Sequence, residues 1–223
     1  MISRPEVRFT RKYYDGLQST QEKVKTTIKK LQGRMMQFTE MLKYRRSIRK
    51  FQNKSVPVET IQEMIKESTF APNAGNEQPW KFIIVDNRGM LERMSNESKK
   101  NILARIAANP NDRAKKYKGM LKNESFNVFY NAPCLVIILG PANLKNLYVD
   151  CALAAGYFMM AATSRGLGTC WVNLGAEIKD PGMISELGIS DDCRIVAPII
   201  VGYPEKIPAA PKRREPEILK IIT

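Results

Sequence analysis

The chain has 223 residues, 43% of them hydrophobic, and a formal net charge of +14. A chain of this length can bury one sizeable core, and we expect one domain. It contains no histidine, which excludes Ser-His-Asp and Cys-His nucleophilic chemistry. Its four cysteines include no C-x-x-C pair, so a zinc site is not expected.

The positive charge is concentrated in two segments. Residues 1–36 carry 9 Lys and Arg against 3 Asp and Glu, and residues 93–122 carry 9 against 2. Such charge suits nucleic acid, an anionic membrane surface or a phosphorylated small molecule, and composition does not choose among them. The first residues lack the apolar core of a signal peptide, so we expect free thiols and a cytoplasmic protein.

The predicted elements alternate between helix and strand. Apolar residues from Leu17 to Met35 recur at helical spacing on a basic segment, which predicts an amphipathic N-terminal helix. The run Leu147–Ser164 contains Asp150 and is short for a membrane span, so we expect a buried helix. Periodicity and turn residues predict further helices at 56–69 and 181–189, and buried strands at 80–86, 132–140 and 194–204.

Three short stretches are candidates for a site. "RRSIRKF", residues 45–51, is either a solvated basic face or an anion site. "APNAGNEQPW", residues 71–80, is a loop whose small residues and amide side chains suit a flat heterocycle, although a plain turn has the same composition.

The third stretch is "SRGLGTCWVN", residues 164–173. Its "GLG" lacks the third glycine of the dinucleotide fingerprint and follows a helix instead of a strand, which excludes a Rossmann site. Gly166 or Gly168 is instead expected to close the preceding helix, with a short strand after it.

In this order, together with "VGYP" and a terminal "PKRR", these pieces resemble the nitroreductase family of FMN-dependent oxidoreductases over Thr39 to Arg214. The resemblance implies an α+β, three-layer fold with a central, mostly antiparallel sheet covered by helices. It also implies an intertwined homodimer. Residues 37–223 would form the FMN-binding domain with its C-terminal arm, and residues 1–36 a basic helical extension.

The resemblance also assigns cofactor contacts, but no catalytic side chain and no metal. A phosphate dianion favours guanidinium and hydroxyl donors, which agrees with arginines and a serine at its site. For Arg46, solvent or the nicotinamide substrate remains an alternative partner. The implied contacts are Arg45, Arg46, Ser47 and Arg49 at the phosphate and ribityl chain; Pro72, Asn73, Ala74, Asn76 and Gln78 from the other subunit; Trp171, Val172, Asn173 and Leu174 along the flavin ring; and Lys212 and Arg214 as a second basic pair.

The implied activity is hydride transfer from NAD(P)H through FMN to a small electron-poor acceptor such as a nitroaromatic or a quinone. Two departures from the family pattern stand out: residues 155–157 replace a polar pair, and residues 96–100 match too loosely for assignment. The same FMN fold also serves dehalogenation, flavin fragmentation or flavin binding. The net charge keeps a nucleic-acid-binding protein as a rival, although no binding module is recognisable.

Overall fold

Two apolar strands form the centre of the sheet in the computed structural model, which describes residues 37–223. Strand β2 (Cys134–Pro141) pairs antiparallel with β4 (Cys193–Gly202), with an irregularity in register between Ile138 and Leu139. The sheet order is β1-β2-β4-β3, with β1 (Lys81–Val85) and β3 (Gly168–Trp171) at the edges. All three pairings are antiparallel, as expected.

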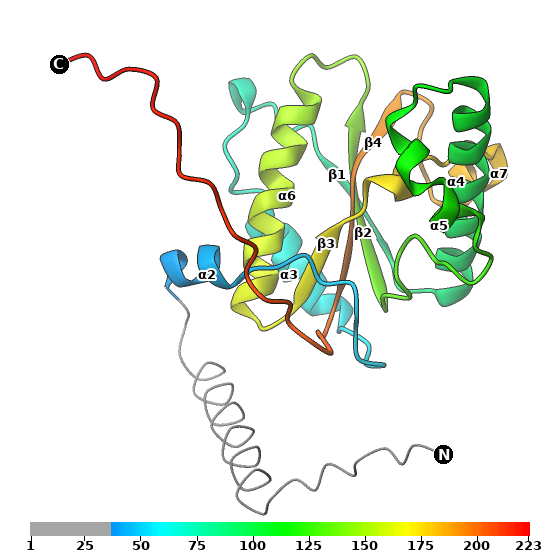
Figure 1. Ribbon diagram of the computed structural model, residues 1–223, viewed down its shortest axis with the longest axis horizontal. Coiled ribbons are helices and arrows are strands. Elements are labelled where there is room, and N and C mark those ends of the chain that lie inside the picture. Colours follow the sequence, from blue (N-terminus) through cyan, green and yellow to red (C-terminus); the bar gives the residue numbers. More distant parts are fainter. Residues whose placement is uncertain (1–36) are drawn as a thin grey trace, which may run out of the picture. The chain divides into compact units, whose positions relative to one another are not determined.

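Helices cover both faces of this sheet and make three layers (Figure 1). Side chains alternate along β2, so that Val136 and Ile138 enter one core cluster and Leu135 and Ile137 enter the other. The first cluster lies under α3 (Val58–Ser68) and α6 (Leu147–Ser164). The second is covered by α4 (Arg88–Ala108), α5 (Lys118–Lys122) and α7 (Pro181–Glu186).

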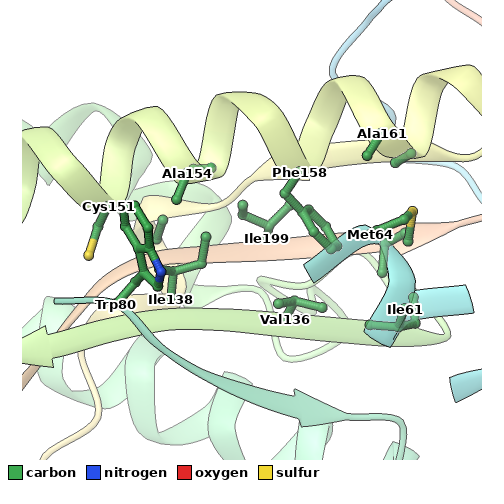
Figure 2. Packing of buried hydrophobic residues seen from close by; sticks show 14 of the residues in the cluster. Ile61, Met64, Trp80, Val136, Ile138, Cys151, Ala154, Phe158, Ala161 and Ile199 are labelled. Carbon is green, nitrogen blue, oxygen red and sulfur yellow. The ribbon is translucent and has the colours of Figure 1, made fainter. Parts of the chain in front are cut away.

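The α6 side of the core is closely interdigitated. Figure 2 shows Phe158 of α6 lying between Ile199 and Met64, with Trp80 beneath Cys151. The short elements complete the described chain: α2 (Phe38–Tyr44) and the 3-10 helices η1 (Ala74–Asn76), η2 (Arg113–Tyr117) and η3 (Asn173–Ala176).

Most predicted elements are present. The four expected strands and the helices α3, α6 and α7 occur where the sequence indicated, but β1 is an edge strand in which only Val85 is buried. The expectation of a fully buried first strand is therefore wrong, because β1 pairs with β2 alone. Helix α7 ends at Glu186, and Gly188 has a positive φ of 68° just beyond it.

Helix α4 was not predicted, although its 21 residues make it a major element of the second face. Polar residues occupy several of its buried positions, including Ser95, Ser98 and Lys99. Lys99 Nζ donates hydrogen bonds to three backbone carbonyls, at 2.9 to 3.2 Å. An apolar stripe interrupted in this way does not show the helical period.

Within the described residues, α6 has the length and composition of a membrane-crossing helix. It is nevertheless a core element here, since its buried face packs on α3 and the sheet. The predicted N-terminal helix lies outside the described residues. After β4 the chain continues to Thr223 as an exposed segment without regular secondary structure beyond Glu205 (Figure 1).

Candidate functional site

The basic segment that begins at Arg45 runs beside β3. Ile48 N donates to Thr169 O at 2.9 Å, and Ser47 forms a parallel bridge with Thr169. Side chains alternate along such an extended segment. Ile48 is buried, so Arg45, Ser47 and Arg49 lie together on the opposite face.

A glycine allows this close approach. A Cβ atom on Gly168 would lie 2.5 Å from Ile48 Cγ1, nearer than real contacts allow. Gly166, with a φ of 72°, closes α6 two residues earlier. The two glycines of "GLG" therefore have separate roles, one ending the helix and one seating the basic segment on β3.

Cys170 of β3 lies next to the basic segment. Its neighbour Thr169 pairs with Ser47, and Cys170 lines the same cleft as Arg49. Burial raises the pKa of the Cys170 thiol, and Arg49, the Ser47 hydroxyl and Arg45 act in the opposite direction. The structure therefore places Ser47 and Arg49 beside β3, with Arg45 on the same face of the segment.

Arg46 shares a small cavity with Arg45, separate from the cleft that Arg49 lines. Its Nη1 donates to Arg45 O at 2.6 Å, and its Nε is buried with no partner among the described residues. It lines a small cavity with Tyr44 and Thr163, on the side of α6. Its contact with a cofactor stays a prediction.

A cleft of about 780 Å³ opens beside this segment, within the usual size of a small-molecule site. The residues predicted to follow a flavin ring, Trp171 to Leu174, form one wall together with Arg49. The rest of the lining comes mainly from the end of α4, η2 and α5. Its lining residues are Ile102, Arg105, Asn109, Asn111, Asp112, Arg113, Ala114, Lys116, Tyr117 and Met120, with Tyr130, Cys170 and Glu177 completing the cleft.

The lining residues from α4, η2 and α5 were not predicted from the sequence. Arg105 spans the cleft lining, with Nε 3.3 Å from Asp112 Oδ2 and Nη1 3.0 Å from Glu177 Oε1. It thereby connects α4 to η2 and to the residue after η3. The excess of basic residues in 93–122 was a signal for this wall, but it did not identify which cations reach the cleft.

The lining residues that follow β3 present N–H groups that can donate hydrogen bonds. Val172 N donates to Pro198 O at 2.8 Å, whereas Asn173 N and Leu174 N, at the start of η3, have no backbone acceptor in the described part of the chain. The indole Nε1 of Trp171 is buried and also lacks a partner among these residues. A polar ligand in the cleft could accept from such groups.

The loop after α3 has a strained, internally bonded conformation. Gly75, Asn76 and Gln78 have positive φ angles of 56°, 54° and 47°. Asn73 Oδ1 accepts from Gln78 N at 2.8 Å, and Gln78 Nε2 donates to Asn76 Oδ1 at 3.2 Å. The loop is thus an ordered structure and not a simple turn.

Asp150 fixes this loop to α6. Ala74 N donates to Asp150 Oδ1 at 3.1 Å, and the other carboxylate oxygen is buried without a partner among the described residues. The acid inside an apolar helix was the sequence signal for this contact. Neither Pro72 nor any other predicted loop residue is among the residues lining the cleft of the same chain.

The second basic pair is separate from the cleft in the single chain. Lys212 and Arg214 are exposed on the C-terminal segment and do not line the cleft. Ile207, nearer the start of that segment, lies beside Arg45 and Arg46. Of the predicted contacts, Arg49 and residues 171–174 line the cleft of the single chain. Arg45 and Ser47 belong to the same segment beside β3, and the loop and the terminal pair do not line the cleft.

Residues 42–203 match the model of the nitroreductase family. The chain belongs to this family. The match contains the basic segment, the loop and the cleft wall after β3, and it ends before Lys212 and Arg214. The family resemblance noted in the sequence is therefore confirmed over the core of the domain.

The chain is similar to proteins that are named for different activities. The chain is 28% identical over 205 residues to a Methanothermobacter thermautotrophicus protein named "Putative NADH dehydrogenase/NAD(P)H nitroreductase", covering 89% of this chain and 94% of that one. It is 26% identical over 211 residues to iodotyrosine deiodinase 1 of Sus scrofa, covering 86% and 70%.

A solved structure supports the fold. The crystal structure of an FMN-bound nitroreductase from Bacteroides fragilis superposes with a TM-score of 0.68 and 24% identity, covering 83% of this chain and 97% of that one. At this identity the likeness establishes the nitroreductase fold, and the α+β expectation is confirmed.

Proposed function

We propose that the protein is an FMN-dependent oxidoreductase that passes reducing equivalents from NAD(P)H to an electron-poor acceptor such as a quinone or a nitroaromatic. The observation that carries the proposal is the seating of the basic segment beside β3: Ser47 pairs with Thr169, and Arg49 joins Trp171 to Leu174 in lining the cleft. A charged phosphate and a flat ring need these two features side by side.

The residues present fit FMN. Two guanidinium groups and a hydroxyl suit a phosphate dianion, while the partnerless Trp171 Nε1 and the amides of Asn173 and Leu174 offer donors to a polar ring edge. Bound FMN would supply the hydride chemistry. The chain's own residues would bind the phosphate, orient the ring and exclude water.

The overall reaction consumes NAD(P)H, a proton and a quinone, and releases NAD(P)⁺ and a hydroquinone. The chain contains no histidine, and no side chain is assigned a covalent role. This matches a cofactor-centred reaction, in which the protein contributes positioning and electrostatics.

We further propose a homodimer with FMN at the subunit interface. Val149, Leu153 and Tyr157 recur every four residues along α6 and are exposed in the single chain. An exposed apolar stripe of this kind is typical of a protein interface. Because Asp150 anchors the 72–78 loop to the same helix, a second copy on this stripe would meet that loop.

In such a dimer, Pro72, Asn73, Ala74, Asn76 and Gln78 would reach the partner's flavin. Lys212 and Arg214 would complete a phosphate site through the exposed C-terminal arm. The location proposed with this function is the cytoplasm, where the thiols of four cysteines remain reduced.

Purification followed by spectroscopy and kinetics tests this function. We expect a visible absorbance maximum, release of FMN on denaturation, and oxidation of NADH or NADPH with a panel of quinones and nitroaromatics. A colourless protein that binds no added FMN and oxidises neither nucleotide would refute the proposal. Steeply salt-dependent retention of DNA by that protein would favour the nucleic-acid rival.

A further inference from the structure

The part of the cleft lining that comes from η2 carries two cations on one side of this short helix. Arg113 and Lys116 of η2 both line the cleft, whereas Lys115 between them does not. Side chains three residues apart are eclipsed on a 3-10 helix, which explains why these two share a direction. Both are exposed and available to a ligand.

The acids of the cleft are already paired with another arginine. Arg105 binds both Asp112 and Glu177, at 3.3 and 3.0 Å. Asp112 also caps η2 by accepting from Ala114 N at 2.7 Å. Neither acid is therefore free to neutralise a neighbouring cation.

Arg113 and Lys116 consequently have no acidic partner in the described part of the chain. Among residues 37–223, neither forms an ion pair with a carboxylate. Lys116 Nζ lies 5.0 Å from the centroid of the Tyr117 ring, a weak contact that leaves its charge in place. This part of the cleft thus presents two cations without a counter-ion.

Apolar and aromatic surface lies beside these cations. Tyr117, Met120 and Tyr130 line the same cleft; Tyr117 is the last residue of η2, and Met120 belongs to α5, which follows it. A flat ring would be covered by such side chains, since aromatic rings and thioethers both pack well on π systems. The wall combines a ring-binding surface with an anion-binding end.

We propose that the cleft selects acceptors in which an aromatic or quinonoid ring carries a negatively charged group such as a carboxylate, and that Arg113 and Lys116 bind that charge. This inference rests on the proposed function and names the acceptor class of the same site. Arg49 faces the cleft too, but is assigned to the cofactor phosphate.

Matched acceptors test the inference on the FMN-loaded protein. We expect kcat/KM for 4-nitrobenzoate to exceed that for the neutral 4-nitrobenzamide. In the double variant Arg113→Gln, Lys116→Gln, the ratio of the two kcat/KM values should fall by about tenfold, as expected for two partly solvated ion pairs. Raising the ionic strength should reduce the wild-type ratio, because exposed charges are screened.

Binding gives a readout independent of turnover. In calorimetric titrations, the oxidised FMN-loaded protein should bind benzoate with a lower Kd than benzamide. The double variant should lose this difference in Kd. Lys115→Gln is the matched control, since it removes a charge from the same turn without changing the cleft. Its acceptor ratio should equal that of the wild type.

Three results would overturn the inference. These are equal wild-type kcat/KM for the two acceptors, an equal loss of preference in Lys115→Gln, or a double variant whose main effect is a raised KM for NADPH over NADH. The last would assign the cations to a nucleotide phosphate. Any of these could occur in an active flavoprotein, whereas failure of the proposed function would appear as absence of bound FMN and of nucleotide oxidation.

Discussion

The amide of Ala74 donates a hydrogen bond to the buried carboxylate of Asp150, 76 residues further along the chain, at 3.1 Å. This contact holds the 72–78 loop against α6, the helix that carries the exposed apolar stripe. The loop and the proposed dimer surface are therefore one structural unit.

Replacing Asp150 tests that unit. Asp150→Ala removes the acceptor of the Ala74 amide, and we expect a loss of about 1–3 kcal/mol in the free energy of unfolding together with weaker FMN binding. Asp150→Asn is the matched variant, because it keeps an acceptor oxygen of similar shape. Urea unfolding and FMN titration measure both effects. Equal FMN affinity in Asp150→Ala and wild type would show that the loop does not contribute to the site.

The close contact between Ile48 and Gly168 is the basis of a second prediction. Gly168→Ala places a methyl group about 2.5 Å from Ile48 Cγ1 and should displace the basic segment from β3. We expect a loss of about 1–3 kcal/mol in stability and a weaker FMN complex.

Gly119→Ala in α5 is its control, because a Cβ there meets nothing within 4 Å. That variant should gain about 0.5–1 kcal/mol from reduced backbone entropy and keep its FMN. If Gly168→Ala behaved like Gly119→Ala, the seating of the basic segment on β3 would be irrelevant to the cofactor.

The phosphate assignment predicts the behaviour of Arg45→Ala combined with Lys212→Ala. Each charge-assisted contact contributes about 1.5–3 kcal/mol, so FMN affinity should fall at least tenfold per contact while the protein stays folded. Lys50→Ala, an exposed cation of the same segment, is the control. A double variant that purifies with unchanged FMN affinity would disprove the assignment.

The apolar stripe of α6 predicts the oligomeric state. Leu153→Lys with Tyr157→Glu places charges within the proposed interface, which should shift a dimer toward monomer and reduce FMN content. Sedimentation velocity measures the assembly. Lys118→Glu, on the other face of the sheet, should remain dimeric. A wild-type chain that is monomeric with FMN bound would contradict the shared site.

Residues 1–36 carry a prediction from sequence alone. Their apolar positions, Leu17, Val24, Ile28 and Leu31, favour packing on the outside of the dimer over docking of an acidic electron-donor protein. A chain starting at Gln37 should keep its NAD(P)H turnover and FMN content but melt at a lower temperature. Turnover lost only with a protein donor, and only at low ionic strength, would support docking instead.

Local signals account for the elements that were predicted correctly. The strands β2 and β4 are apolar runs that are buried almost continuously, and α3 has its buried residues one turn apart. Helix α4 escaped prediction because Ser95 and Lys99 face the interior. There, Ser95 Oγ accepts from Val128 N at 3.0 Å, and Lys99 donates to the carbonyls of a distant loop.

By itself, the sequence determined the four strands, the helices α3, α6 and α7, and the family. Short-range periodicity and motif order carry that information. Only the tertiary structure decided that Arg105 joins Asp112 to Glu177, leaving Arg113 and Lys116 unneutralised. The absence of an acidic partner for these two cations depends on the ion pair of Arg105 with Glu177, 72 residues further along the chain. Only the packing of α4 against η3 brings those two side chains together.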